Sequence, residues 1–241
     1  MVRIIKGTVF NSKADTLVNT VNTVGVMGAG LAKEFALRYP KVEEEYKLYC
    51  KTGQLSIGHP KLHRLDAINV MSFPTKKHWK NPSKLEYIES GLKYFVANYS
   101  KVNLGTVAFP KLGTDKGKLN WDHVKSIMFK YLEPIVDIDI VICLDELQHA
   151  EGVEREMLKV LEKTVSMDKE ERESIGIYLP NKCIAMLENE GVPCRLKHIQ
   201  NYPGIGSISY DKLFRSLYTL VLNESQSEEN RGLEHTQLSL F

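Results

Sequence analysis

Short runs of β-branched residues alternate along the chain with longer segments in which apolar residues recur at helical spacing. The runs with strand character cover residues 2–6, 15–21, 67–73, 105–109 and 138–144. The segments between them predict helices at 30–38, 41–50, 83–99 and 121–132. Ser83 and Glu86 are spaced as a capping box at the start of the third helix. Strands alternating with helices predict an α/β fold in which helices cover both faces of one sheet.

The strand pattern ends at residue 145, and only helical segments follow, at 154–165, 182–191 and 209–222. The turn PGIGS before the last of them fits a plain turn, and it also fits the hairpin of a helix-hairpin-helix element that contacts DNA phosphates. The remaining residues are polar and acidic until the last five, which predicts a disordered tail. We therefore predict three parts, an α/β domain, a small mainly helical appendix and a tail, over 1–146, 147–222 and 223–241.

Composition restricts the class of protein. The 32 basic and 30 acidic residues leave a formal net charge of +2, so overall charge indicates neither a nucleic-acid nor a membrane partner. No run is apolar over the roughly 18 residues of a membrane span, and we expect a cytoplasmic protein. The cysteines lack CxxC spacing and predict reduced packing residues rather than a metal or disulfide site; they are Cys50, Cys143, Cys183 and Cys194. We expect no cofactor and no metal.

Two glycine-rich loops each lie between a predicted strand and a predicted helix. The first, GVMGAGLAKEF, follows a strand that carries Asn19 and Asn22 near its end, and the second is FPKLGTDKGKLNW at 109–121. Such loops present backbone N–H groups, backed by a helix N-terminus, to an anion. The first loop matches neither the dinucleotide nor the Walker pattern, and taken alone it is as compatible with a structural turn as with an anion site. Two such loops at one crevice suit a diphosphate.

The motifs KGTVF, NTVN, GVMGAGLA and FPKLGTDKGKLNW resemble the macrodomain family over about residues 1–146. The resemblance implies a three-layer α/β/α fold with a mixed central sheet that binds ADP-ribose. The stretch FPTKKHWKNPSKLEYIESGL is similar to the branch that contains the DarG antitoxins and the terminal ADP-ribose glycohydrolases, in which a lysine after this strand is catalytic.

This resemblance assigns ADP-ribose contacts by position. The adenosine side corresponds to Gly7, Thr8 and Val9, where Thr8 replaces an aspartate that many macrodomains use for adenine. The distal ribose and diphosphate correspond to Asn19, Asn22, Gly25, Val26, Met27, Gly28, Ala29, Gly30, Leu112, Gly113, Thr114, Asp115, Lys116 and Gly117. Gly117 stands where the protein-acting branch carries a catalytic aspartate, and Asp115 lies two residues earlier.

Lys76 is the predicted catalytic residue. Cleavage of an ADP-ribosyl bond passes through an oxocarbenium-like state, and a partly desolvated amine beside the ribose can activate the leaving group or act as nucleophile. Lys76 aligns with the family lysine, whereas Lys77 points to the other side of an extended chain. Without the resemblance, a Thr-Lys-Lys pair is typical of a solvated loop.

The segment after Lys76 is the predicted DNA-binding element, with Lys77, His78, Trp79 and Lys80. Basic side chains beside an aromatic ring suit single-stranded DNA, although Trp79 is equally compatible with a surface-packed hydrophobe. His63 and His123 receive no role.

The resemblance implies removal of ADP-ribose from thymidine in single-stranded DNA, which reverses a DarT-type toxin, itself a possible partner. Two alternatives stay open. One is hydrolysis of ADP-ribose esters on protein carboxylates or of O-acetyl-ADP-ribose, and the other is a non-catalytic ADP-ribose reader. The missing aspartate at Gly117 disfavours the first, and Lys76 disfavours the second.

The last five residues resemble the short peptide by which bacterial DNA-replication and repair proteins bind the sliding clamp. In that mode the polar anchor is Gln237 and the apolar ones are Leu238, Leu240 and Phe241. The same side chains are also compatible with packing back onto the domain, or with no role.

Overall fold

In the computed structural model, which describes the backbone of residues 1–238 and the side chains of residues 1–227, the first part of the chain forms one six-stranded sheet. The strand order is β1-β6-β5-β2-β4-β3, and only β3 runs antiparallel, against β4. The strands are β1 Val2–Ile5, β2 Thr16–Asn22, β3 Lys61–Arg64, β4 Asn69–Lys76, β5 Thr106–Pro110 and β6 Asp139–Cys143. Because five strands are parallel, the loops that follow them open at one edge of the sheet.

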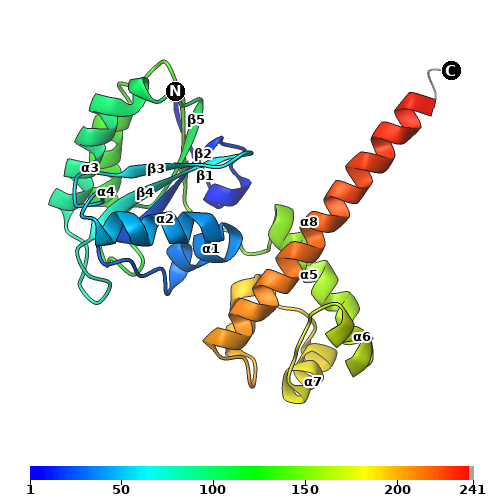
Figure 1. The fold of residues 1–241 in the computed structure, drawn as a ribbon. Coiled ribbons are helices and arrows are strands. Elements are labelled where there is room, and N and C mark those ends of the chain that lie inside the picture. The colour runs from blue at the N-terminus through cyan, green and yellow to red at the C-terminus, as the bar shows by residue number, and fades with distance from the viewer. Residues whose placement is uncertain (239–241) are drawn as a thin grey trace. The chain divides into compact units, whose positions relative to one another are not determined.

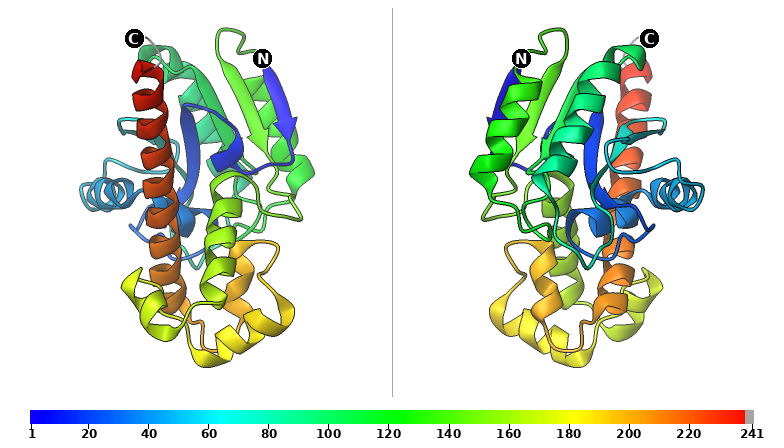
Figure 2. Two further views of the ribbon diagram at one scale, coloured as in Figure 1. Left: turned by 90° about the vertical axis from the view of Figure 1, so that its right-hand side faces the viewer. Right: turned by 90° about the vertical axis from the view of Figure 1, so that its left-hand side faces the viewer.

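Helices cover both faces of this sheet (Figure 1 and Figure 2). One face carries α1 and α2, and the other carries α3 and α4, which lie side by side. Their bounds are α1 Gly30–Arg38, α2 Pro40–Lys51, α3 Leu85–Asn98 and α4 Trp121–Leu132. The single-turn 3₁₀ helices are η1 Val9–Asn11 and η2 Tyr99–Lys101.

Alternation along the strands creates the two cores. In β2, Leu17 packs into the core under α1 and α2, while its neighbour Val18 packs into the core under α3 and α4. Val141 and Ile142 divide in the same way in β6. A strand that is buried on both faces has a nearly continuous run of apolar residues, and the central strands show this pattern in the sequence. The predicted three-layer α/β/α fold with a mixed sheet is confirmed.

Two local predictions were wrong. The edge strand β3 was not expected, because its sequence KLHR lacks the β-branched residues that mark the other strands. The capping box was also wrong: the N-cap of α3 is Lys84, with no side-chain cap, and the hydroxyl of Ser83 is buried without a hydrogen-bond partner among the described residues. Instead, the Ser83 backbone N–H donates to the Gly117 carbonyl at 2.9 Å.

The chain divides into two compact units, Met1–Leu147 and Gln148–Phe241. The described residues of the second unit form helices and no strand. These are α5 Gly152–Val165, α6 Lys169–Ser174, α7 Asn181–Glu190, the 3₁₀ helix η3 Leu196–Asn201, and α8 Ser207–Leu238. A buried ion pair inside the unit joins Glu154 to Arg195 at 2.9 Å.

Helix α8 continues to Leu238, through residues for which the sequence predicts a disordered tail. Of the predicted clamp-binding residues, Leu240 and Phe241 lie outside the described residues, and Gln237 and Leu238 are described by backbone alone. No helix in the described part of the chain combines the length and apolar character needed to cross a bilayer.

A buried hydrogen-bond network ties the antiparallel edge of the sheet to α2. His63 of β3 is fully buried, and its Nδ1 lies 2.8 Å from Glu45 Oε2 in α2 while its Nε2 lies 2.9 Å from Ser72 Oγ in β4. The ring of Tyr49 packs over His63 at 5.5 Å. Burial lowers the pKa of His63, and Glu45 opposes that shift. The histidine that the sequence left without a role therefore joins three elements.

This network predicts a pH-dependent stability. Because the pKa of His63 is lower in the folded than in the unfolded chain, acid favours the unfolded state, which binds the proton first. Stability is full above about pH 6.5 and decreases as the pH falls toward the folded pKa, by at most ~1.4 kcal/mol per pH unit. Urea unfolding between about pH 7.5 and about pH 5 should show a shallower decrease for His63→Gln than for the wild type. The exposed His123 provides the control, and an equal change in His123→Gln would contradict the assignment.

Candidate functional site

The first glycine loop connects β2 to α1 at the carboxyl edge of the sheet. Its backbone requires glycine at two positions, since φ is +81° at Gly25 and +57° at Gly30. Helix α1 begins at Gly30 with Ala29 as its N-cap, which has no side-chain acceptor for the first-turn amides. The loop therefore directs an uncapped helix N-terminus toward the carboxyl edge, as an anion site requires.

Asn22 organises this loop from within. Its Oδ1 accepts from the amides of Val24 and Val26 at 3.0 and 3.4 Å, and its Nδ2 donates to the Val26 carbonyl at 2.6 Å. The hydroxyl of Tyr46, in α2, lies 3.0 Å from both the carbonyl oxygen and Oδ1 of Asn22. Asn22, which the sequence predicts to contact the ribose, therefore uses its side chain to hold the backbone of its own loop.

Asn19 lies deeper than the predicted site suggests. The residue is fully buried, and its Nδ2 lies 3.7 Å from the sulfur of Met27 in the loop above. Its Oδ1 is buried and has no hydrogen-bond partner among the described residues. Asn19 therefore supports the loop from below, rather than lying on the loop surface.

The second glycine loop follows β5 and faces the first. A β-carbon on Gly30 would lie 3.4 Å from Asp115 Oδ2, which shows how closely the two loops approach each other. Hydrogen bonds hold the second loop in shape: the Gly113 carbonyl accepts from the Leu119 amide at 3.1 Å, and the Thr114 hydroxyl donates to the Lys111 carbonyl at 3.1 Å.

Lys76 reaches this loop from the end of β4. A register shift after Val21 pairs Asn22 of β2 with Lys76, although Val21 itself pairs with Pro74. The Lys76 amine donates a hydrogen bond to the Lys116 carbonyl. Lys76 is only 9% exposed. Burial lowers its pKa, while the Asp115 carboxylate raises it.

The structure separates Lys76 from Lys77 as the alternation of an extended strand predicts. Lys77 is exposed, and its carbonyl accepts from the backbone N–H and the hydroxyl of Thr23 at 3.3 and 2.8 Å. The two loops and Lys76 therefore come together, with Lys77 directed to solvent.

Gly117 has no room for a side chain. A β-carbon there would lie 2.1 Å from the Gly113 carbonyl oxygen and 2.4 Å from Ser83 Oγ. The aspartate that the related branch carries at this position cannot be accommodated without moving the loop.

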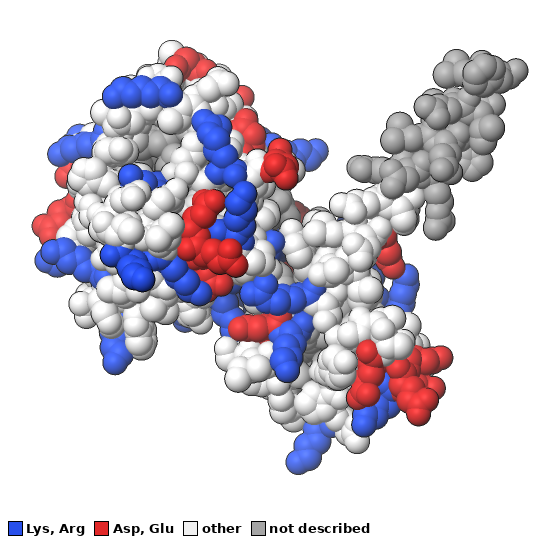
Figure 3. Space-filling model, in the orientation of Figure 1, with Lys and Arg blue, Asp and Glu red and all other residues white. Residues whose placement is uncertain are grey.

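The predicted DNA-binding segment is a solvent-facing aromatic and basic cluster next to Lys76. The rings of His78 and Trp79 stack at 5.5 Å, and the Lys80 amine lies 5.0 Å from the centre of the Trp79 ring. Trp79 is 49% exposed, so about half of its surface is in contact with solvent. Elsewhere, basic and acidic side chains are interspersed on the face shown in Figure 3.

The predicted adenosine-side residues follow β1 at the same edge of the sheet. The Gly7 carbonyl accepts from the Asp145 amide at 3.1 Å, which fixes the chain after β1. Thr8 and Val9 are buried at the start of η1. Their backbone, rather than their side chains, is what this edge offers to a ligand.

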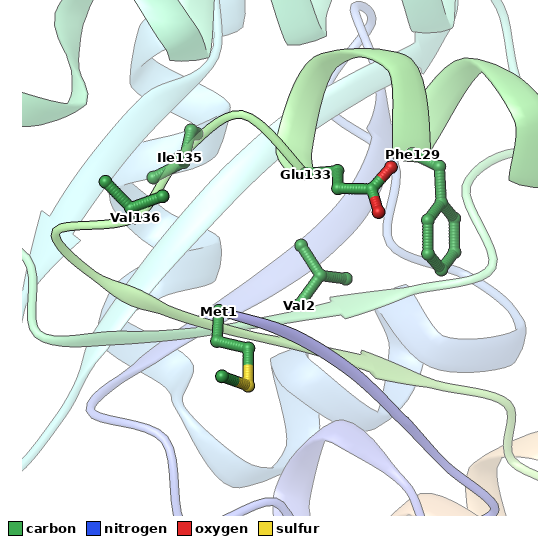
Figure 4. A pocket seen from close by; sticks show the side chains of 6 residues that line it. All are labelled: Met1, Val2, Phe129, Glu133, Ile135 and Val136. Atoms are coloured by element: carbon green, nitrogen blue, oxygen red, sulfur yellow. The ribbon is translucent and has the colours of Figure 1, made fainter.

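Two cavities lie away from these loops. One of about 290 Å³ is at the amino-terminal end of β1 (Figure 4) and is lined by Met1, Val2, Phe129, Glu133, Ile135 and Val136. The other, of about 240 Å³, lies between β3 and α3 and includes Leu62, Tyr94 and Tyr99. Neither is lined by a predicted site residue. Among the described residues, no group of three or more His, Cys, Asp or Glu side chains is placed to hold a metal.

Comparison with known proteins identifies the class. The Macro domain family matches residues 18–128. A DNA ADP-ribosyl glycohydrolase of Mycobacterium tuberculosis is 39% identical over 142 residues, which are 56% of this chain and 40% of that protein. This chain therefore spans about two fifths of the length of the DNA ADP-ribosyl glycohydrolases that it matches.

Two solved structures extend this result. The macrodomain of Thermus aquaticus DarG is 35% identical, with a TM-score of 0.57, and the match covers 59% of this chain and 97% of that one. The Thermosipho africanus DarTG structure in complex with ADP-ribose is 36% identical, with a TM-score of 0.58, over 59% of this chain and 41% of that one.

The fold is a three-layer α/β/α domain in which two glycine-rich loops approach each other at the carboxyl edge of the sheet, and these loops form its candidate ligand site. The chain belongs to the macrodomain family.

The crowding at Gly117 predicts a large difference between two alanine substitutions. Gly117→Ala should lower the free energy of unfolding by about 1–3 kcal/mol, because the new β-carbon overlaps the Gly113 carbonyl. Gly28→Ala is the control, since its β-carbon would meet only Val26 Cγ1, at 3.6 Å. Urea unfolding measures both variants. Similar stability of the two would show that the second loop relaxes easily around position 117.

Proposed function

We propose that this protein is a DNA ADP-ribosyl glycohydrolase that removes ADP-ribose from thymidine in single-stranded DNA. The observation that carries the proposal is the buried amine of Lys76, held at the second glycine loop beside the first. The relatives named DNA ADP-ribosyl glycohydrolase and the relative bound to ADP-ribose support it.

ADP-ribose fits the carboxyl edge as follows. The diphosphate lies against the N-terminus of α1, where the loop from Gly25 to Gly30 offers backbone amides. The distal ribose lies between the two loops, near Lys76. The adenosine reaches toward Gly7 and Val9, after β1. Binding brings the diphosphate close to the Asp115 carboxylate, so that side chain turns away or is screened by the neighbouring lysines.

Hydrolysis breaks the bond between the anomeric carbon of the distal ribose and the thymine nitrogen. Water supplies a hydroxyl to that carbon, and a proton goes to the leaving base. As a neutral amine, Lys76 attacks the anomeric carbon, the thymine leaves with the electron pair of the broken bond, and water then cleaves the new bond to Lys76 and regenerates the amine. As an ammonium, Lys76 instead protonates the leaving base while water attacks the anomeric carbon, and the proton that this water loses restores the ammonium. Burial makes both forms accessible by lowering the pKa of Lys76 toward the working range. Either role requires the amine to exchange its bond to the Lys116 carbonyl for the substrate.

The second loop favours DNA over protein esters as the substrate. An enzyme that relies on a carboxylate at position 117 needs space there, and the contacts of Gly117 leave none. This disfavours the first alternative, hydrolysis of protein-linked esters or of O-acetyl-ADP-ribose. The second alternative is a non-catalytic ADP-ribose reader.

Single-stranded DNA reaches Lys76 across the exposed cluster that follows it. Trp79 offers a ring face for a base, and Lys77 and Lys80 offer cations for phosphates. These side chains lie next to Lys76 in sequence, so a modified thymidine and the next nucleotide lie within reach together.

The partners are proposals as well. A DarT-type toxin is a proposed functional partner, since the Thermosipho africanus relative is a DarTG protein. A bacterial sliding clamp is the proposed partner of the segment that ends in Gln237, Leu238, Leu240 and Phe241.

Lys76→Ala should reduce release of ADP-ribose from a thymidine-modified oligonucleotide by roughly 10²- to 10⁴-fold, because the reacting amine is lost. Affinity for free ADP-ribose should stay within a few-fold of the wild type. Lys77→Ala is the comparison, since its side chain faces solvent: the loss of one phosphate contact should raise the KM for the oligonucleotide by no more than a few-fold and leave kcat nearly unchanged. Equal rates for the two variants would reject Lys76, and activity on ADP-ribosylated protein alone would favour the alternative substrate.

Truncation after Thr236 should abolish recovery of a bacterial sliding clamp in a pull-down, while hydrolysis of a free modified oligonucleotide continues. The truncated chain keeps the whole macrodomain unit, so catalysis and clamp binding are separated. Recovery of the clamp by both chains, or by neither, would remove the clamp from the proposed partners.

A further inference from the structure

Helix α2 contributes a buried hydroxyl to the first glycine loop that the proposed reaction does not use. Tyr46 is fully buried, and its hydroxyl is shared between the carbonyl oxygen and Oδ1 of Asn22, 3.0 Å from each. The two residues are 24 positions apart in the sequence. A buried hydroxyl needs a partner, and here both acceptors belong to the residue that begins the loop.

The hydrogen bonds continue from Tyr46 through Asn22 into the loop backbone. Asn22 Oδ1 accepts from the amides of Val24 and Val26, and Asn22 Nδ2 donates to the Val26 carbonyl. The Asn22 side chain therefore bonds to the backbone of Val24 and Val26, on either side of Gly25, and holds the turn together. The hydroxyl of Tyr46 holds that side chain in the orientation in which its oxygen faces the amides and its nitrogen faces the carbonyl.

Helix α2 also supports the loop by direct packing. The position of a β-carbon on Gly25 lies 3.7 Å from Cys50 Cβ and 3.8 Å from the Cα of Lys47, so the helix surface lies immediately behind the turn. Burial raises the pKa of the Tyr46 hydroxyl, so the hydroxyl is protonated and can donate at neutral pH.

We propose that Tyr46 is a positioning residue for ADP-ribose: through Asn22, its hydroxyl holds the turn between β2 and α1 in the shape that receives the distal ribose and diphosphate. The inference rests on the proposed function for the identity of the ligand. A loop that is ordered before binding loses less conformational entropy when the ligand arrives. Loss of the hydroxyl therefore acts on affinity rather than on the chemical step.

Tyr46→Phe, which removes the hydroxyl and keeps the ring, tests this. We expect ADP-ribose affinity, measured by calorimetry, to decrease about five- to tenfold, as for one lost hydrogen bond that leaves a buried acceptor unpaired. On modified oligonucleotide, KM should increase by a similar factor while kcat changes less than twofold. Amide hydrogen exchange at Val24 and Val26 should accelerate, with the core strands unchanged.

Tyr49→Phe is the matched control, because Tyr49 lies on the same helix and packs its ring over His63. It should leave ADP-ribose affinity and the exchange of both amides unchanged. Wild-type affinity and wild-type exchange in Tyr46→Phe would overturn the proposal. Faster exchange throughout the domain, with an equal loss in both tyrosine variants, would also overturn it, since Tyr46 would then be only a core residue.

A second variant protects the test against poor folding of Tyr46→Phe. Asn22→Ser breaks the same chain of hydrogen bonds at its centre, and it should weaken ADP-ribose binding and expose the Val24 and Val26 amides. Adding Tyr46→Phe to Asn22→Ser should weaken binding little further, because the hydroxyl acts through Asn22. Unchanged affinity in Asn22→Ser, or fully additive losses in the double variant, would overturn the proposal.

The binding and exchange measurements use no DNA. A protein that binds ADP-ribose and shows the Tyr46 effect, yet leaves modified DNA intact, would reject the proposed activity and retain the positioning role. A protein that hydrolyses modified DNA normally with Tyr46 replaced, at unchanged KM, would do the reverse.

Discussion

The shift of register between β2 and β4 is the constraint on which the site depends. Val21 pairs with Pro74, but the next residue, Asn22, pairs with Lys76, so Thr75 is an extra residue in β4. Proline cannot donate to a strand ladder, and a bulge is where a sheet tolerates it. The shift places the end of β4 beside the residue that organises the first loop. A buried lysine and a glycine turn from separate parts of the sequence thereby share one edge of the sheet.

Around this point the site is built mostly from backbone groups. The first loop presents backbone amides, and in the second loop the Lys116 and Gly117 carbonyls accept hydrogen bonds from the Lys76 amine and the Ser83 backbone N–H. The two loops are closely packed because backbone groups reach a ligand only where the side chains are small. Gly117 shows the limit, with no space for even one carbon. The same crowding separates this chain from an enzyme that uses a carboxylate at that position, and in the proposed reaction Lys76 is the reactive group.

Much of the fold was predictable because its signals are local. Helix α4 begins at the residue expected, since Asn120 caps it by accepting from the Asp122 and His123 amides. The burial of Lys76 and the exposure of Lys77 follow from the alternation of an extended chain. The edge strand β3 could not be found, because its pattern is weak and the pairing with β4 supplies its structure. Ser83 was misassigned as a cap because its backbone is bound by a loop 34 residues later in the numbered sequence, at Gly117.

The sequence by itself determined five of the six strands, helices α1 to α4, the two glycine loops and the lysine at the end of β4, because periodicity, turn chemistry and side-chain alternation act between neighbours in the chain. Only the tertiary structure decided what those parts do to each other. It showed that Asn22, predicted to contact the ribose, organises the first loop, that Tyr46 supports Asn22, and that His63 lies between β3, β4 and α2. Each of these contacts joins segments that are far apart in sequence, and hydrogen bonds across such distances depend on packing that no local pattern encodes.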